Sequence, residues 1–225
     1  MPPASVLRQH SRTLLITAAA VPLALAALAG DDVRLRRQLD AARKDPLTGL
    51  LRRDAYTARA RRILARHGDN VAVVMIDADH FKDINDGLGH AAGDAVLAAT
   101  GARLTAWAGP RAAVGRLGGD EFAVVLELRA DARGRCFEQL LRMLRAPVIL
   151  DDGRTVDVAV SVGVANPDVI GSRDLSVLQR AADAALYAGK HSGEATFAGP
   201  AHITVPTVNG RRMGRLGTGL WGRAA

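Results

Sequence analysis

The sequence predicts an α+β domain with a βαββαβ core of the ferredoxin-like type, in which helices pack on an antiparallel sheet. A continuous apolar run at 71–77, two short apolar runs joined by glycines within 112–126 and an alternating run at 155–165 supply four strands. Segments with helical spacing lie between these runs. We therefore expect a four-stranded sheet with its helices on one face.

The first elements follow from local pattern. Residues 54–66 are basic and predict a helix, and the run VAVVMID at 71–77 is typical of a strand buried on both faces. Residues 93–107 predict the next helix, because Val96, Leu97 and Leu104 follow helical spacing. The runs 112–117 and 122–126 predict a hairpin, since only Gly118-Gly119-Asp120-Glu121 separates them.

The remaining elements close the core. Residues 135–145 predict a helix with four apolar side chains at helical spacing, Phe137, Leu140, Leu141 and Leu144. Residues 155–165 predict one strand, because five alternating valines share a face, namely Val156, Val158, Val160, Val162 and Val164. Residues 174–189 predict the last helix, with an apolar stripe of Leu175, Leu178, Ala182 and Leu186.

The N-terminal residues 1–30 contain an uncharged apolar segment at 13–29. Its length is slightly below the about 20 residues of a membrane span, and a signal peptide or a buried helix are the alternatives. More basic residues follow the segment than precede it, which favours an anchor in the cytoplasmic membrane with the rest of the chain in the cytoplasm. A cytoplasmic protein without an anchor is the other alternative.

Three further parts complete the organisation. Residues 31–44 predict a helical linker, because Leu35, Leu39 and Ala42 share one face, either as the seam of a short coiled coil or as a solvated connection. Residues 45–198 form the compact domain. Residues 199–225 are basic, rich in glycine and without a sustained period, which predicts a mobile tail.

Charge and cysteine content exclude two classes of protein. The net charge is +7, but 27 of the 30 basic residues are scattered arginines, and no aromatic residues interleave with them as in a nucleic-acid platform. We therefore expect no nucleic-acid partner. The single cysteine, Cys136, excludes an internal disulfide framework. The three lysines, Lys44, Lys82 and Lys190, mark places that favour a compact charge.

Two carboxylates converge in the predicted sheet. Asp77 ends the first strand and Asp120 lies at the hairpin tip, so both reach one edge of the sheet. Carboxylates brought together raise each other's pKa, and a divalent cation such as Mg²⁺ removes that penalty while binding substrate phosphates. Gly118 and Gly119 allow a ligand to approach the backbone. The alternative is a plain hairpin with an acidic turn.

The segment DADHFKDINDGLGHAAGD at 77–94 adds polar groups at regular intervals. Lys82 is within reach of a phosphate, and an amide with a carboxylate, Asn85 with Asp94, can read the edge of guanine. His90 lies between them, and we expect a narrow loop with glycines at 87, 89 and 93. Helix capping is the alternative for Asn85 and Asp94, and a local hydrogen bond is the alternative for His90.

At this point the sequence resembles a known family. RLGGDEF at 116–122 matches the signature of the GGDEF family, the diguanylate cyclases. The blocks DPLTGL at 45–50, MIDADHFKDINDGLGHAAGD at 75–94 and AADAALYAGKHSG at 181–193 resemble its other motifs in the same order. The resemblance covers roughly residues 45–197 and implies a sheet similar to the palm of polymerases and adenylyl cyclases.

The resemblance implies a role for each matching residue. The metal ligands are Asp77 and Asp120 through their side chains and Ala78 through its carbonyl, holding Mg²⁺ or, in its place, Mn²⁺. Glu121 is the general base for the ribose 3′-OH and a further metal ligand. Phosphate contacts fall to Lys82, also counted as catalytic, and to Lys190. The remaining GTP contacts are Asn85, His90, Asp94, Gly118 and Gly119.

The implied reaction condenses two GTP into cyclic di-GMP and two pyrophosphates. Since each domain holds one GTP, a homodimer is required. The alternative is a catalytically weak or inactive module that binds GTP or a protein partner, and a third interpretation is a membrane-bound interaction protein.

Three positions depart from the family pattern. Residues 109–112 lack the RxxD motif of product inhibition, which predicts no tight feedback through that site. Glu194 stands where an arginine usually follows four residues after the last lysine. Its charge would repel a triphosphate and weaken GTP binding, and the alternative is that its side chain points elsewhere. Leu51 and Arg52 replace the usual Pro-Asn, a minor change.

Overall fold

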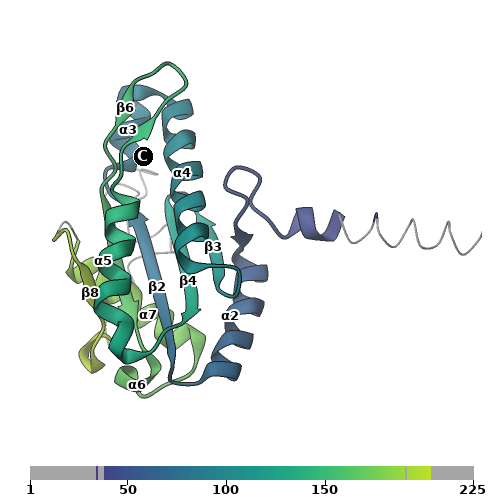
Figure 1. Ribbon diagram of the computed structural model, residues 1–225, viewed down its shortest axis with the longest axis vertical. Coiled ribbons are helices and arrows are strands. Elements are labelled where there is room, and N and C mark those ends of the chain that lie inside the picture. Colours follow the sequence, from purple (N-terminus) through teal and green to yellow (C-terminus); the bar gives the residue numbers. More distant parts are fainter. Residues whose placement is uncertain (1–33, 35–37, 191, 204–225) are drawn as a thin grey trace, which may run out of the picture. The chain divides into compact units, whose positions relative to one another are not determined.

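The computed structural model describes residue 34 and residues 38–190 and 192–203, in two units that divide between Arg43 and Lys44 (Figure 1). In the first unit the backbone is helical at Arg34 and at 38–42. The rest of the predicted linker, the apolar segment 13–29 and most of the predicted tail lie outside the described residues. The described part of the chain contains no helix that meets the length and hydropathy of a membrane span.

The second unit is built on a six-stranded sheet with the order β1-β3-β4-β2-β7-β8. The four inner strands are antiparallel, and the short edge strands pair parallel with their neighbours. The strands are β1 (Leu51–Arg52), β2 (Val71–Ala78), β3 (Ala113–Gly118), β4 (Glu121–Glu127), β7 (Val160–Ala165) and β8 (Ala195–Phe197). The predicted α+β class is confirmed, and the predicted strands are the inner four.

The connections are mostly helical. The helices are α2 (Arg53–His67), α3 (Phe81–Leu88), α4 (His90–Ala108), α5 (Arg133–Leu144), α6 (Pro167–Ile170) and α7 (Leu175–Ala188), with 3-10 turns η1 (Ala130–Ala132) and η2 (Pro200–Ile203). The predicted helices at 54–66, 135–145 and 174–189 are confirmed within two residues at each end. Asp174 caps α7 by accepting from the Val177 N–H at 3.0 Å.

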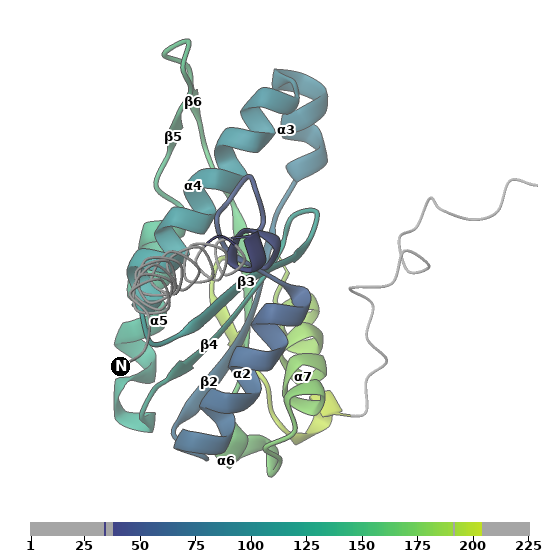
Figure 2. The same ribbon diagram turned by 90° about the vertical axis from the view of Figure 1, so that its right-hand side faces the viewer.

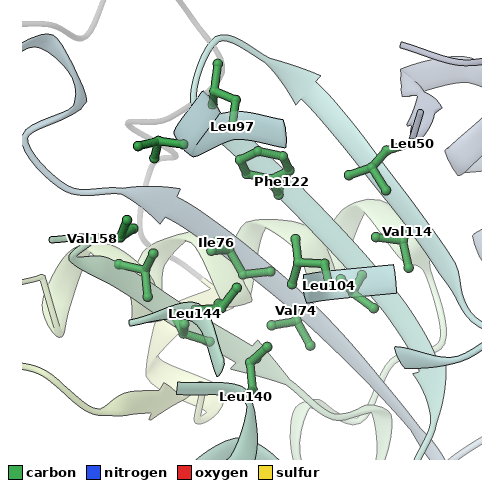
Figure 3. Close-up of a cluster of buried hydrophobic side chains, with 14 of the residues drawn as sticks. Leu50, Val74, Ile76, Leu97, Leu104, Val114, Phe122, Leu140, Leu144 and Val158 are labelled. Carbon is green, nitrogen blue, oxygen red and sulfur yellow. The ribbon is translucent and has the colours of Figure 1, made fainter. Parts of the chain in front are cut away.

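The prediction that all helices lie on one face is wrong. Side chains of β2 alternate between two cores, with Val74 and Ile76 in one and Val73 and Met75 in the other. Helices α4 and α5 cover the first core, which Figure 3 shows in part, and α2 and α7 cover the second (Figures 1 and 2). All eight residues of β2 are buried, as its continuous apolar run predicted.

The single strand predicted at 155–165 is also wrong in part. Val156 lies in β6 (Thr155–Val156), which pairs with β5 (Val148–Ile149) in a separate two-stranded sheet, and β7 begins only at Val160. The chain leaves one sheet and enters the other between these strands. The five alternating valines nevertheless pack into the same core, so the face was predicted correctly and the continuity of the strand was not.

Candidate active site

The turn between β3 and β4 brings carboxylates to the end of the central strand. Glu121 begins β4 directly opposite Asp77 in the strand register, and the Ala78 N–H donates to the Asp120 carbonyl at 3.3 Å. Gly119 has a φ of 51°, a left-handed conformation that favours glycine. The structure therefore brings Ala78 and Glu121 together with Asp77 and Asp120, the two carboxylates for which the sheet topology predicted it.

The carboxyl groups at this edge raise the pKa values of Asp77 and Glu121. Burial raises the pKa of Asp77, and the charges of Asp120 and Asp79 raise it further, against a hydrogen bond from Lys190 that lowers it. Burial also raises the pKa of Glu121, followed by the charges of Asp77, Asp183 and Asp120. The raised pKa values indicate an acidic site that a cation would stabilise.

Lys190 is bound to this acidic edge. Its Nζ lies 2.9 Å from Asp77 Oδ1. Burial alone would lower the pKa of Lys190, but the hydrogen bond to Asp77 and the neighbouring carboxylates raise it. The preceding helix α7 can lie close to the sheet because Gly163 of β7 has no side chain. A Cβ at this position would overlap the Ala182 carbonyl oxygen. This close packing brings Lys190, just past the end of α7, to the end of β2.

Asp79 is a buried carboxylate to which the sequence reasoning assigned no role. The Ser161 hydroxyl of β7 donates to it, with Oγ 2.8 and 3.0 Å from its two oxygens, and the Asp79 N–H donates to the Ala159 carbonyl at 2.9 Å. The sequence feature that could have indicated Asp79 is its position two residues after Asp77. The charge of Asp79 is among the causes that raise the pKa of Asp77.

Lys82 and Asn85 lie on α3 and His90 and Asp94 on α4, so the expectation of a narrow loop with glycines at 87, 89 and 93 is wrong. Helix α3 ends at Leu88, the backbone changes direction at Gly89, where φ is 87°, and α4 starts at His90. A Cβ at Gly93 would overlap Asn85 Oδ1, so the absence of a side chain on α4 makes room for the amide of α3. Asn85 thereby lies beside the residue that precedes Asp94.

The capping interpretation of Asp94 is excluded by the same geometry. The N-cap of α4 is Gly89, and Asp94 is exposed in the second turn of the helix. His90 is likewise exposed at the first position of α4. Lys82 on α3 is exposed and lies 4.0 Å from Asp86, in an i,i+4 pair. Asn85 and Asp94 thus occupy neighbouring positions, while Lys82 and His90 point to solvent or local partners.

A clamp on the β3–β4 turn was not foreseen. Arg116 donates to the Gly119 carbonyl at 2.8 Å and to Asp45 at 3.1 Å. Asp45 also accepts from the N–H and hydroxyl of Thr48, and these bonds, opposed by burial, lower its pKa. Arg53 donates to the Leu117 carbonyl at 3.0 Å. The signal was the Asp45-x-x-Thr48 spacing, which is typical of a side-chain-stabilised turn.

The donor chemistry at this edge fits a magnesium ion bound in part by substrate. The described residues contain no group of three histidine, cysteine or acidic side chains arranged to hold a metal. The predicted ligands are the Ala78 carbonyl and the carboxylates of Asp77, Asp120 and Glu121, and these three acids are not arranged as a preformed metal group in the described structure. Mg²⁺ is commonly held by one or two carboxylates together with phosphate oxygens, so a complete protein cage is not required.

Comparisons with known proteins identify the family of the domain. The family described as "Diguanylate cyclase, GGDEF domain" matches residues 42–196. An uncharacterized 19.3 kDa protein of Streptomyces ambofaciens is 44% identical over 156 residues, which are 69% of this chain and 82% of that protein. Diguanylate cyclase TpbB of Pseudomonas aeruginosa is 38% identical over 154 residues, which are 66% of this chain but only 35% of TpbB.

Solved structures give the same result. The GGDEF domain of PA1120 (TpbB or YfiN) from Pseudomonas aeruginosa is 36% identical, with a TM-score of 0.63, over 71% of this chain and 96% of that one. The coiled coil and GGDEF domain of DgcB from Caulobacter crescentus, solved in complex with c-di-GMP, is 27% identical, with a TM-score of 0.67, over 79% and 99%. The chain therefore belongs to the GGDEF domain family of diguanylate cyclases.

Proposed function

We propose that this chain is an active diguanylate cyclase, which condenses two GTP into cyclic di-GMP and two pyrophosphates as a homodimer. The observation that carries the proposal is the register of the central strands. Asp77 and Glu121 are paired across β2 and β4, and Lys190 reaches Asp77 from the end of α7. A metal-binding acid, a base and a phosphate-binding cation are thus available at one edge.

Glu121 is proposed as the general base. Burial and the neighbouring carboxylates raise its pKa, so its carboxylate is a stronger base than that of an exposed glutamate. In each half-reaction Glu121 accepts the proton of a ribose 3′-OH. The 3′-oxygen forms a bond to the α-phosphorus of the other GTP, and the bond from that phosphorus to pyrophosphate breaks.

The other residues hold the substrate for this step. Asp77, Asp120 and the Ala78 carbonyl would bind Mg²⁺, with Glu121 as a further ligand, and Mn²⁺ is a chemically suitable replacement. The metal supplies charge neutralisation for the triphosphate. Lys190 and Lys82 bind phosphates, and the glycine pair at 118–119 leaves room for them.

Guanine recognition is assigned to the junction of α3 and α4. The contact between Asn85 and Gly93 supports this assignment, because it fixes the amide beside the position of Asp94. The Asp94 carboxylate accepts from guanine N1–H and the 2-amino group, and Asn85 binds the remaining edge. His90, exposed at the start of α4, is proposed as a further substrate contact.

Two copies of the domain must face each other, because one site holds one GTP and the product joins two. We further propose that residues 13–29 anchor the chain in the cytoplasmic membrane. The domain would then lie in the cytoplasm, where GTP is present. A cytoplasmic chain without an anchor is the alternative.

The second candidate function is a module that binds GTP without turnover. Glu194 favours it, since this exposed carboxylate lies four residues after Lys190, where it would repel a triphosphate. In the deciding experiment the purified full chain is incubated with GTP and Mg²⁺ at high protein concentration, and cyclic di-GMP is measured beside a Glu121→Gln control. Product from the parent alone supports the cyclase, whereas GTP binding without product from either protein supports the module.

A further inference from the structure

The ammonium of Lys190 is bound to Asp77, a carboxylate that is proposed above as a metal ligand. It is bonded to Asp77 Oδ1 at 2.9 Å, and the two side chains are 34% and 11% exposed. The same ammonium is also within electrostatic range of Asp79 and Asp120. A cation supplied by the protein itself therefore offsets the charge of the carboxylates.

Other cations near the site have different partners. Lys82 is paired with Asp86, Arg116 with Asp45, and Arg53 donates to the backbone of the β3–β4 turn. Within the described residues, the recorded ion pair of Asp77 is the one with Lys190. Asp77 thus depends on Lys190 for its direct neutralisation.

We propose that Lys190 is an exchangeable counter-ion, which binds Asp77 in the empty site and transfers to the triphosphate when a divalent cation replaces it on Asp77. This inference rests on the proposed function, because it assigns the nucleotide phosphates as the second partner of Lys190. Its consequence is that cation and nucleotide bind with positive coupling, each removing an obstacle to the other.

The coupling follows from competition for one carboxylate. A divalent cation alone must displace the ammonium from Asp77, which leaves a partly buried charge without its partner. A bound triphosphate provides that partner, so the displacement becomes easier. By linkage, a cation on Asp77 makes Lys190 available and strengthens nucleotide binding by the same factor.

The local backbone suits such an exchange. Lys190 follows the end of α7 in a short turn, with its N–H bonded to the Tyr187 carbonyl at 3.3 Å and the Ser192 N–H bonded to Gly189 at 2.9 Å. The backbone of the turn is therefore held while the four-carbon side chain is able to rotate. The exchange requires motion of one side chain and no movement of the helix.

The test measures Mn²⁺ binding to the full chain by calorimetry, with and without 3′-deoxy-GTP, which lacks the reacting hydroxyl. Lys190→Met is expected to bind Mn²⁺ alone about tenfold more tightly than the parent and to lose most of the coupling. Lys44→Met is the matched control, because it removes an exposed lysine that forms a backbone bridge with Leu51 and is not part of the acidic edge. Its Mn²⁺ affinity and its coupling should equal those of the parent. Lys190→Arg keeps the counter-ion and should bind Mn²⁺ alone as weakly as the parent.

Thermal unfolding provides an independent readout. Without metal, Lys190→Met should unfold at a lower temperature than the parent, and Mn²⁺ should raise the Tm of the variant by more than it raises the Tm of the parent.

The exchange of Lys190 between Asp77 and phosphate would be overturned if folded Lys190→Met bound Mn²⁺ as weakly as the parent or more weakly. If Lys190→Met does not fold, Lys190→Gln replaces it in the same comparison. The measurement with Mn²⁺ alone needs no turnover, so failure of the cyclase assay leaves this result distinguishable.

Discussion

Gly93→Ala tests how the domain positions the Asn85 amide, which is proposed to bind guanine. A Cβ at position 93 would overlap Asn85 Oδ1, and it would lie 3.0 Å from Asn85 Cγ and 3.1 Å from Phe81 Cζ. Carbon atoms in ordinary contact are about 3.5–4.0 Å apart, so the amide must move by at least ~0.5 Å. The half-buried Asn85 can rotate away, which moves its hydrogen-bonding groups from their positions.

The expected effect on stability is small and that on binding is large. Alanine is favoured over glycine within a helix by about 1 kcal/mol, which offsets the displacement of a flexible side chain. The unfolding free energy should therefore stay within ~1 kcal/mol of the parent. Loss of two hydrogen bonds to guanine weakens binding by about 1–3 kcal/mol, or roughly 5- to 150-fold.

The assay compares the Kd of GTP with that of ATP for the parent and Gly93→Ala, together with urea unfolding of both. Gly134→Ala on α5 is the control, because an added Cβ there meets no atom within 4 Å, and it should leave both Kd values unchanged. Parental GTP affinity and parental preference over ATP in a folded Gly93→Ala variant would refute the assignment of Asn85 to guanine.

Three other perturbations test the acidic edge and its supports. Burial and the charge of Asp77 raise the pKa of Glu121, so the folded metal-free protein keeps the Glu121 carboxyl protonated to higher pH than the unfolded chain does. The unfolding free energy should therefore fall as pH rises from the usual carboxylate range through the raised pKa. Urea unfolding at stepped pH should show a smaller decrease for Glu121→Gln than for the parent. Arg116→Ala removes the hydrogen bonds to Asp45 and to the turn, and we expect the urea-unfolding free energy to drop by about 2 kcal/mol; no change would contradict the clamp. Glu194→Arg should tighten GTP binding roughly threefold at low salt, with the gain lost at high salt, and equal affinity at both would show that this carboxylate does not face the phosphates.

Sequence pattern was sufficient for the inner sheet because its strands carry strong apolar signals. The run at 71–77 predicted a strand covered on two faces, and this already contradicted the expectation of helices on one face alone. The paired glycines predicted the turn that carries Asp120. These local features placed Asp77 and Asp120 at one edge without any knowledge of distant contacts.

Other features depend on contacts that periodicity does not encode. The break at Gly89 was missed because 81–88 is only eight residues long, so its apolar stripe of Phe81, Ile84 and Leu88 spans just two turns within a polar segment. The alternation at 155–165 gave the buried face, but the change of sheet before Val160 requires tertiary information. The contact of Lys190 with Asp77 joins residues 113 positions apart, so a role in phosphate binding could be expected but the ion pair could not.

The clamp on the β3–β4 turn has a consequence for where the domain can be cut. Its anchors come from the first residues of the domain, with Asp45 lying 71 positions before Arg116 and Arg53 lying 64 positions before Leu117. A fragment that starts at residue 54 would retain every inner strand and, apart from Leu50, every buried residue of the two cores, and by those criteria it would count as folded. It would lack the two contacts that hold the acidic turn, so a trimmed chain can preserve its fold and still lose its chemistry.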